Sequence, residues 1–330
     1  MSQGSGVLVI AEQRGGGLSP VVNELVTAGT SLVGQIGGSV TVGLVGADLD
    51  ALAASAAGIA GVDRVVTVED DRLATFNGTA WSAAVASITG NVAPAVVLAP
   101  ATTAGRDYMP RVAARLGAGH AADAVAVDIV DGKVVATRSM LEDRVQATVA
   151  FEGDRPATIT VRPGSFARAE AGTGSAAIEA FDVAFDDSMF ALTASAPEAA
   201  AAGQQDLANA ERIVAGGRGL GEPDKFALVE ELAGVLNAAV AATRPLSDAG
   251  WRPHSDQIGQ TGAQVSPKLY VAVGISGAAQ HLMGVQNADY IVAINRDPEA
   301  PIFKVASFGI VGDLFDVVPA VIAELKAVQA

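Results

Sequence analysis

Short apolar runs alternate with longer Ala-rich stretches through the first half of the chain. The runs that predict strands are residues 7–10, 41–45, 64–68 and 95–98, and the stretches that predict helices are residues 79–89 and 106–116. Continuous apolar strands separated by helices are typical of a parallel sheet that is covered on both faces. The pattern changes later in this half, where residues 124–130, 133–140, 146–151 and 158–161 predict consecutive strands. With Asp131-Gly132 as a hairpin turn, these strands predict a small antiparallel addition.

The second half repeats the alternation of strands and helices. Strands are predicted at residues 212–215, 269–273 and 290–294, a short extended segment at 303–305, and helices at 225–241 and 314–328. Gly-rich or polar clusters follow these strands at residues 216–221, 259–262 and 274–281, and at Asn295. Because ligands bind outside the carboxyl ends of strands in open parallel sheets, these clusters predict one ligand site in the second half.

A stretch of small apolar residues separates the two halves. Residues 191–202 read ALTASAPEAAAA, a composition that favours a linker, although Ala-rich segments also form helices. We therefore predict two α/β domains, residues 1–195 and residues 196–330. Each is expected to contain a mostly parallel sheet covered by helices, in a Rossmann-like or flavodoxin-like arrangement.

Composition and charge exclude several classes of function. The chain has 330 residues and no cysteine, which excludes disulfides, cysteine-bound iron–sulfur clusters and a thiol nucleophile. Its 21 Lys and Arg residues against 36 Asp and Glu residues give a net charge of −15, which argues against binding to nucleic acid or to anionic membranes. No targeting or membrane-spanning segment is evident, so we expect a cytoplasmic protein.

Two glycine-rich loops carry most of the candidate chemistry. The loop GGRGLG at residues 216–221 suits an anion, but its spacing matches no nucleotide-binding motif, and a tight turn explains it equally well. The segment GISGAAQH at residues 274–281 lets a ligand approach the start of a helix closely. There Ser276 either contacts a phosphate or caps the helix, and His281 either reaches the same ligand or is structural.

Two further segments bring polar groups to the same region. Residues 259–262, GQTG, offer hydrogen-bond partners to a heteroaromatic ring, or form a solvated turn. Residues 243–245 are Thr-Arg-Pro, in which Arg244 either brings a positive charge to the site or forms a surface ion pair that adds little stability. The chain has no nucleophile-elbow motif and no helical histidine pair, so the sequence does not support hydrolase or metal chemistry.

Taken together, these segments resemble the alpha subunit of electron transfer flavoprotein. Residues 273–319 resemble the family signature almost throughout, and GGRGL at 216–220, the turn at 247–251 and GQTG at 259–262 also fit. In the first half, residues 98–117 and 160–167 are the most similar segments. The resemblance covers essentially the whole chain.

The resemblance implies one noncovalent FAD per heterodimer, held mainly by the second domain. It also implies a beta subunit that carries AMP, acyl-CoA dehydrogenases and related flavin dehydrogenases as electron donors, and electron transfer flavoprotein quinone oxidoreductase as acceptor. The chain would then be an electron carrier of fatty acid beta-oxidation, without a substrate of its own. The flavin-binding positions carried over are Arg218, Thr243, Arg244, Ile258, Gly259, Gln260, Thr261, Ser276, Gly277, Ala278, Ala279, Gln280, His281, Asn295, Asp313 and Leu314.

Three of these residues are expected, by resemblance, to tune the flavin. His281 would lie near O2 of the isoalloxazine, Thr261 would donate toward N5, and Arg244 would lie over or beside the ring. A cation or donor at such positions stabilises the negative charge of a reduced ring. One departure from the family is Pro245, which is tolerable in the first turn of a helix but not elsewhere.

The remaining assignments concern the dinucleotide. By resemblance, Ser276 would hold the diphosphate, and Asn295 and Asp313 would contact the adenosine half. Two other functions stay open: a self-sufficient flavin- or nicotinamide-dependent oxidoreductase, and a non-redox module that binds only an adenine nucleotide. The presence of only three histidines and the absence of cysteine weaken the oxidoreductase alternative.

Overall fold

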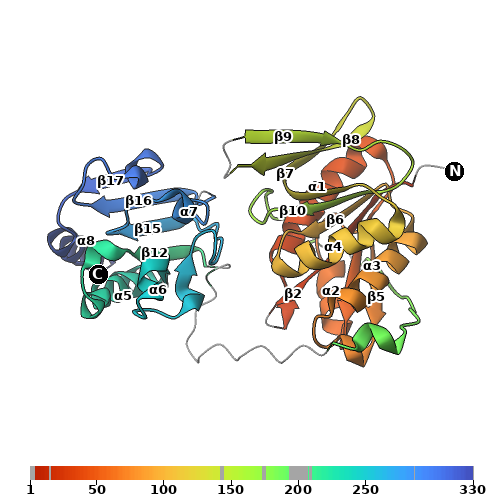
Figure 1. The fold of residues 1–330 in the computed structure, drawn as a ribbon, viewed down its shortest axis with the longest axis horizontal. Coiled ribbons are helices and arrows are strands. Elements are labelled where there is room, and N and C mark those ends of the chain that lie inside the picture. The colour runs from red at the N-terminus through yellow and green to blue at the C-terminus, as the bar shows by residue number, and fades with distance from the viewer. Residues whose placement is uncertain are drawn as a thin grey trace. The chain divides into compact units, whose positions relative to one another are not determined.

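Two compact units make up the chain in the computed structural model, residues 1–198 and residues 199–330. The structure describes residues 4–14, 16–141, 145–172, 176–192, 207, 210–285 and 287–329. The predicted boundary between residues 195 and 196 lies outside these described residues. Each unit has its own mostly parallel sheet covered by helices (Figure 1), which confirms the predicted fold class.

The first unit is built on a nine-stranded sheet with the order β11-β5-β4-β1-β6-β10-β7-β8-β9. Its strands are β1 (Val7–Ile10), β4 (Val40–Gly46), β5 (Arg64–Glu69), β6 (Val96–Pro100), β7 (His120–Val130), β8 (Lys133–Met140), β9 (Val145–Ala150), β10 (Ala157–Val161) and β11 (Ala177–Ala180). Neighbouring strands are parallel except in the pairs β7–β8 and β8–β9. Two short strands, β2 (Gln13–Arg14) and β3 (Gly17–Leu18), form a separate antiparallel pair.

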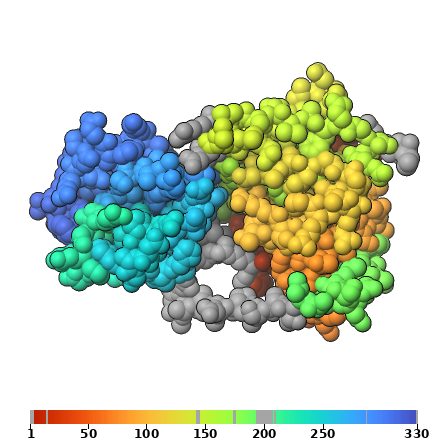
Figure 2. Space-filling view, in the orientation of Figure 1, coloured from red at the N-terminus to blue at the C-terminus, as the bar shows by residue number. Residues whose placement is uncertain are grey.

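Helices cover both faces of this sheet. They are α1 (Val21–Ile36) and α2 (Asp50–Ala57) on one face, and α3 (Gly78–Val92) and α4 (Thr103–Leu116) on the other, with the 3-10 turns η1 (Asp71–Leu73) and η2 (Asp187–Phe190). In Figure 2, α3 and α4 form the orange to yellow surface of this unit. Successive side chains of β1 enter opposite cores, Val9 on the α1 face and Leu8 on the α3 face. This burial on both faces is why the strands are apolar throughout.

The antiparallel addition is smaller than the sequence predicts. Strands β7, β8 and β9 form a meander, and its first turn contains Asp131 and Gly132, both with positive φ. The fourth predicted strand is instead β10, which lies between β6 and β7 and pairs parallel with both. All five residues of β10 are buried, as expected for a central strand.

The second unit contains a six-stranded, parallel sheet with the order β14-β13-β12-β15-β16-β17. Its strands are β12 (Arg212–Gly216), β13 (Ala239–Thr243), β14 (Gln257–Ile258), β15 (Leu269–Val273), β16 (Tyr290–Asn295) and β17 (Phe308–Val311). In this unit β12 comes first, and β13 and β14 follow it on one side of the sheet. The next strand, β15, lies on the other side of β12. This is a doubly wound order, and it reverses between β12 and β15.

Helices of the second unit also lie on both faces. The elements are α5 (Ala227–Leu236), α6 (Arg244–Asp248), α7 (Ala279–Leu282) and α8 (Leu314–Gln329), with the 3-10 turns η4 (Arg218–Leu220), η5 (Pro223–Phe226), η6 (His254–Asp256) and η7 (Pro301–Lys304). α5 and α8 share a core with Val214 and Val271. The opposite face buries Tyr270 and Ala272 together with Ile302 of η7.

The structure confirms one predicted helix of the second unit but shortens it, and it replaces one predicted extended segment. The helix predicted at residues 225–241 ends at Leu236, and its last predicted residues belong to β13. Asn237 adopts the left-handed conformation that ends α5, so the Ala-rich run beyond it is free to extend as a strand. The segment predicted as extended at residues 303–305 falls at η7, and the edge strand is β17 instead.

Strand β17 is an edge of the second sheet, with no further strand beside it among the described residues. All four of its residues are exposed, and the exposed fractions of Phe308 and Val311 are 63% and 57%. Phe315, in the first turn of α8, is also exposed. An apolar, unpaired edge is a surface on which other chains can add strands.

Candidate functional site

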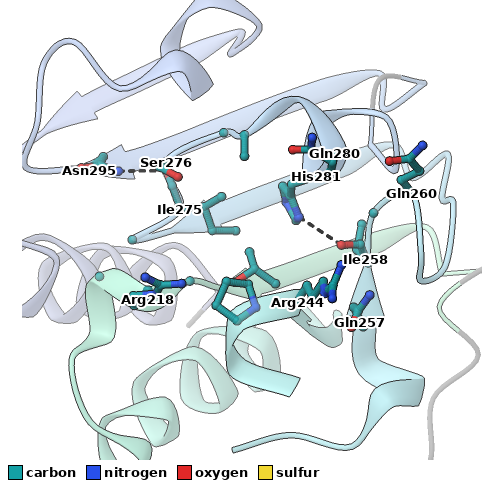
Figure 3. A pocket seen from close by; sticks show the side chains of 18 of the residues that line it. Arg218, Arg244, Gln257, Ile258, Gln260, Ile275, Ser276, Gln280, His281 and Asn295 are labelled. Carbon is teal, nitrogen blue, oxygen red and sulfur yellow. Dashed lines mark hydrogen bonds between the residues drawn. The ribbon is translucent and has the colours of Figure 1, made fainter. Parts of the chain in front are cut away.

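The site lies at the carboxyl ends of β12 and β15, where the strand order reverses. A cavity of about 650 Å³ opens there, a size typical of natural cofactor sites. The predicted residues that line it are Arg218, Thr243, Arg244, Ile258, Gly259, Gln260, Thr261, Ser276, Gly277, Ala278, Gln280, His281 and Asn295. Figure 3 shows Arg218 and Arg244 on one side of this cavity and Ser276 and His281 on the other.

The loops that follow β12 and β15 meet through their backbones, and we call this contact, residues 217–219 with 273–274, the floor of the cavity. The N–H of Gly217 donates to the Val273 carbonyl at 2.9 Å, and the N–H of Gly219 donates to the Gly274 carbonyl at 3.0 Å. A Cβ on Gly217 would lie 2.4 Å from the Gly274 oxygen. The glycines of this loop are therefore required by the close approach of two backbones.

The loop between β15 and α7 is held by bonds to the neighbouring elements. The N–H of Ile302 donates to the Ser276 carbonyl at 3.0 Å, and Asn295 Nδ2 donates to the Ile275 carbonyl at 2.8 Å. Because α7 begins only at Ala279, with Ala278 before it, Ser276 is not the helix cap that the sequence allowed as an alternative. Asn295 thus shapes the loop that presents Ser276 to the cavity.

Thr243 ends β13, and α6 begins at Arg244. Pro245 is in the first turn of α6, where a missing N–H removes no helical hydrogen bond, so this departure from the family is tolerated. Arg244 Nε lies 3.1 Å from Asp248 Oδ2, with both side chains largely exposed, so this pair contributes little stability. Arg244 therefore takes part in a weak surface pair and also lines the cavity.

His281 is buried in a chain of hydrogen bonds. Its Nε2 lies 2.8 Å from Tyr270 Oη. Its Nδ1 lies 3.1 Å from the carbonyl oxygen of Ile258, a bond drawn as a dashed line in Figure 3. Burial lowers the pKa of His281 to about 4, although the bond to Ile258 acts in the opposite direction. The imidazole is therefore neutral at pH 7.

Gln257 fixes the hydroxyl group of Thr261. Nε2 of Gln257 donates to Thr261 Oγ1 at 2.9 Å, which leaves the hydroxyl hydrogen of Thr261 available to another acceptor. Gln257 is 1% exposed, and its Oε1 is buried without a hydrogen-bond partner in the described part of the chain. A buried amide oxygen without a partner beside a cavity can accept a hydrogen bond from a ligand.

Three of the residues implied by the resemblance are not among those that line the cavity: Ala279, Asp313 and Leu314. Asp313 Oδ1 accepts the N–H of Phe315 at 2.8 Å at the start of α8. Leu314 is buried in the core that α8 shares with α5. Asp313 and Leu314 thus support α8, and their contact with FAD stays a prediction.

The cavity also includes residues that the sequence-based list lacks. They are Gly217, Gly219, Pro245, Gln257, Gly274, Ile275 and Arg296. Most of them fall inside the loops that the glycine pattern had marked, so a list drawn from whole loops would have found them. Gln257 and Arg296 lie outside those loops and had no such signal. Tyr270 lies deeper, behind His281, and had no signal either, because a tyrosine in an apolar strand is typical of a core.

The lining residues suit a ligand with an anionic part and an aromatic part. The guanidinium groups of Arg218, Arg244 and Arg296 favour a diphosphate. Ile258 and Ile275 offer apolar surface to a ring, and Thr261 offers a donor to its polar edge. The buried oxygen of Gln257 remains for a donor on the ligand. These features fit FAD.

Comparison with known proteins gives a family for this arrangement. Residues 7–186 match the electron transfer flavoprotein domain, and residues 206–286 match the electron transfer flavoprotein FAD-binding domain. The electron transfer flavoprotein subunit alpha of Bacillus subtilis (strain 168) is 40% identical over 324 residues, which cover 98% of this chain and 98% of that protein. The chain belongs to the electron transfer flavoprotein alpha subunit family.

Other members of the electron transfer flavoprotein alpha subunit family match to a similar extent. The subunit of Thermoanaerobacterium thermosaccharolyticum is 39% identical over 325 residues, covering 98% of both chains. The subunit of Paracoccus denitrificans is 40% identical over 319 residues, covering 97% of this chain and 99% of its own. These matches confirm the resemblance inferred from the sequence motifs.

Two further observations concern other kinds of site. None of the helices in the described part of the chain has the length and hydropathy needed to cross a bilayer. Within the same residues, no three His, Asp or Glu side chains come together in a way that suits a metal ion.

Proposed function

We propose that this chain is the FAD-binding subunit of an electron-carrying heterodimer. The observation that carries the proposal is the cavity at the β12–β15 reversal, which falls almost wholly within the residues that match the FAD-binding domain. An electron carrier needs a bound flavin but no acid or base aimed at a substrate carbon. In agreement, both ring nitrogens of His281, the only histidine among the described cavity residues, bond to groups of the protein.

Arg218 and Ser276 are proposed to bind the diphosphate of FAD from the two sides of the floor of the cavity. A guanidinium group and a hydroxyl are suitable donors for phosphate oxygens. Gln280 and Asn295 are proposed to border the rest of the dinucleotide, with Asn295 acting through the loop that it holds.

The isoalloxazine is proposed to lie between Arg244 and the segment of Thr261 and His281. When bound, FAD supplies the one-electron and two-electron chemistry. Arg244 places a positive charge beside the ring, which favours added negative charge on it. Thr261 donates its free hydroxyl hydrogen to a polar ring atom, while Gln257 donates to the Thr261 oxygen and holds the hydroxyl in place.

The proposal includes partners and a place in metabolism. A beta subunit would complete the heterodimer with its own AMP, so that one FAD is bound per heterodimer. Acyl-CoA dehydrogenases and related flavin dehydrogenases would donate electrons, and electron transfer flavoprotein quinone oxidoreductase would accept them. The support for this assignment is similarity to relatives named as alpha subunits over nearly their full length. We place this carrier in the cytoplasm, in fatty acid beta-oxidation.

Flavin binding tests the proposal directly. The chain is co-purified with its beta subunit, stripped of ligand in denaturant, refolded and titrated with FAD, and the flavin absorbance bands are recorded. We expect one FAD per heterodimer, and a 10- to 100-fold weaker affinity for Arg218→Ala, since a hydrogen bond to a charged group is worth about 1.5–3 kcal/mol.

A matched control is Arg212→Ala. Arg212 lies at the other end of β12, and its Nη1 donates to the Leu236 carbonyl at 2.9 Å, away from the cavity. Its loss should leave FAD affinity unchanged. A protein that stays colourless after addition of FAD but binds AMP would overturn the proposal in favour of a nucleotide module. Turnover of a small substrate without the beta subunit would favour a self-sufficient oxidoreductase instead.

A further inference from the structure

Arg252 joins two elements of the second unit through ionic contacts. It is not one of the described residues that line the cavity. Its Nε and Nη2 lie 2.8 Å and 2.7 Å from Oδ2 of Asp256, the last residue of η6. Its Nη1 lies 2.6 Å from Oε1 of Glu230 in α5. A planar guanidinium, with its donors in a fixed fork, suits such a bridge better than an ammonium group does.

The same guanidinium lies over an aromatic ring that supports the floor of the cavity. Cζ of Arg252 lies 5.0 Å from the centroid of the Phe226 ring, which is within the range of a cation–π contact. Phe226 is buried against the end of β12, because a Cβ on Gly216 would lie 2.6 Å from Phe226 Cε2. The loop that carries Arg218 follows Gly216 directly. Arg252 therefore contacts a side chain that packs beneath this loop.

Asp256 depends on Arg252 for its charge balance. The residue is only 7% exposed, and a carboxylate with so little access to water needs a partner. Oδ2 accepts the two bonds from Arg252, and Oδ1 lies 3.4 Å from the hydroxyl oxygen of Ser255. Without the guanidinium, the carboxylate would have to turn toward water, and the backbone of η6 would move with it.

A movement of Asp256 would reach the cavity through Gln257, the next residue of the chain. Nε2 of Gln257 donates to the Thr261 hydroxyl at 2.9 Å, and its carbonyl accepts the N–H of Ala263 at 2.8 Å. These two bonds connect Gln257 to both the side chain and the backbone of the loop at residues 259–263. A displaced η6 would therefore change where the hydroxyl of Thr261 points.

We infer that Arg252 is a positioning residue for the flavin site, because it holds η6 and β14 where Gln257 and Thr261 face the cavity. The inference rests on the proposed function, since the polar edge of a flavin is what Thr261 would meet. Burial separates this contact from an ordinary surface ion pair. The side chains of Arg252 and Asp256 are 26% and 10% exposed, so water screens their attraction less than it screens an exposed pair.

Hydrogen exchange in the heterodimer without FAD tests the role of Arg252 directly. Arg252→Gln should raise the exchange rates in residues 257–263 by about 10-fold, while β15 and α8 keep their protection. Titration with FAD should then give an affinity about 10-fold weaker than that of the wild type. Arg252→Lys keeps the positive charge but not the fork, so its exchange and its affinity should lie between those of the wild type and Arg252→Gln.

Lys326→Gln is the matched control. Nζ of Lys326 lies 3.0 Å from Oε1 of Glu231, so this pair also ends on α5, but both of its side chains are largely exposed and it joins α5 to α8. Its loss should change neither the exchange of residues 257–263 nor the affinity for FAD. Circular dichroism checks that each variant is folded.

The possible results separate the role of Arg252 from the proposed function. Unchanged exchange in Arg252→Gln, or faster exchange spread evenly over the second unit, would overturn the positioning role even if the wild type binds FAD. Faster exchange confined to residues 257–263, with an unchanged affinity for FAD, would overturn it as well. Local loosening in Arg252→Gln, together with a wild type that does not bind FAD, would support the hold of Arg252 on η6 and β14 and overturn the proposed function.

Discussion

At the scale of single residues, Arg244 combines a cavity position with a weak attachment to the protein. Its ion pair with Asp248 joins two exposed side chains, so the guanidinium remains available to a ligand. Arg244→Gln should lower the reduction potential of bound FAD by about 50 mV, because ~1.4 kcal/mol corresponds to 59 mV for one electron. Spectroelectrochemical titration of the heterodimer measures the shift.

Asp248→Asn is the control for that experiment. It removes the same ion pair but leaves the arginine, so the potential should stay the same or rise slightly. If the two variants lowered the potential equally, the ion pair itself would matter rather than the charge of Arg244 beside the ring.

Glu12 offers a second test at this scale, in the first unit. The Thr102 hydroxyl donates to its carboxylate at 2.8 Å, but burial outweighs this bond and raises the pKa of Glu12 to about 7. Because the unfolded carboxyl titrates near 4.5, the folded state holds the proton more tightly, and stability falls as the pH rises from 4.5 through 7. Glu12→Gln should therefore gain about 1–3 kcal/mol over the wild type at pH 8.

Urea denaturation at pH 5 and pH 8 measures this difference. Glu170→Gln, an exposed position in the same unit, is the control and should not change the pH dependence. An equal stability of Glu12→Gln and wild type at pH 8 would show that the Glu12 carboxylate is not destabilising.

At the scale of elements, the floor of the cavity depends on glycine. Gly219→Ala would bring a Cβ within 2.8 Å of Gly274 Cα, so the loops after β12 and β15 would have to separate. We expect a loss of about 1–3 kcal/mol in the free energy of unfolding. FAD binding should weaken as well, because Arg218 is carried on the same loop.

The contrasting substitution is Gly234→Ala, inside α5. No atom lies within 4 Å of a Cβ at this position, so alanine should stabilise the helix by about 0.5–1 kcal/mol. Chemical denaturation and FAD titration of both variants give the comparison. If Gly219→Ala and Gly234→Ala both bound FAD more weakly, the affinity would depend on the stability of the whole unit rather than on the shape of the floor of the cavity.

Sequence patterns correctly predicted the strands that are buried on both faces. Strands such as β1 and β15 are apolar because both of their faces are covered, and the pattern shows this directly. Strand β13 was missed because AVAAT has the composition of a helix, and only the turn at Asn237 separates it from α5. Strand β10 was placed wrongly because the sequence does not show which strand is its neighbour.

The sequence predicted the site about as completely as it predicted the fold. Loops at the carboxyl ends of strands are marked by glycine and polar residues, so most of the cavity residues were found from the chain and its family resemblance. The state of His281 was not predicted, because it depends on Tyr270 and Ile258, which are brought to the imidazole only by the fold. Likewise, the bond of Asp313 to the N–H of Phe315 at the start of α8 was not predicted, because it depends on where the helix begins.

At the scale of the whole molecule, the chain consists of two units with separate cores, and the cavity belongs to the second alone. FAD at 100 times its dissociation constant should stabilise the second unit by about 2.7 kcal/mol. Hydrogen exchange measured by mass spectrometry should show this gain in β12, β13 and β15. Equal protection in β1 and β4 would mean that the units unfold as one.

The edge strand β17 has a consequence for how the chain behaves before it is assembled. Phe308, Ile310 and Val311 lie along an edge that pairs with no outer strand in the part of the chain that the structure describes. A newly made chain without other subunits would offer this edge to any extended segment, including the same edge of another copy. Production of the chain alone should therefore yield more insoluble material than its production together with a beta subunit.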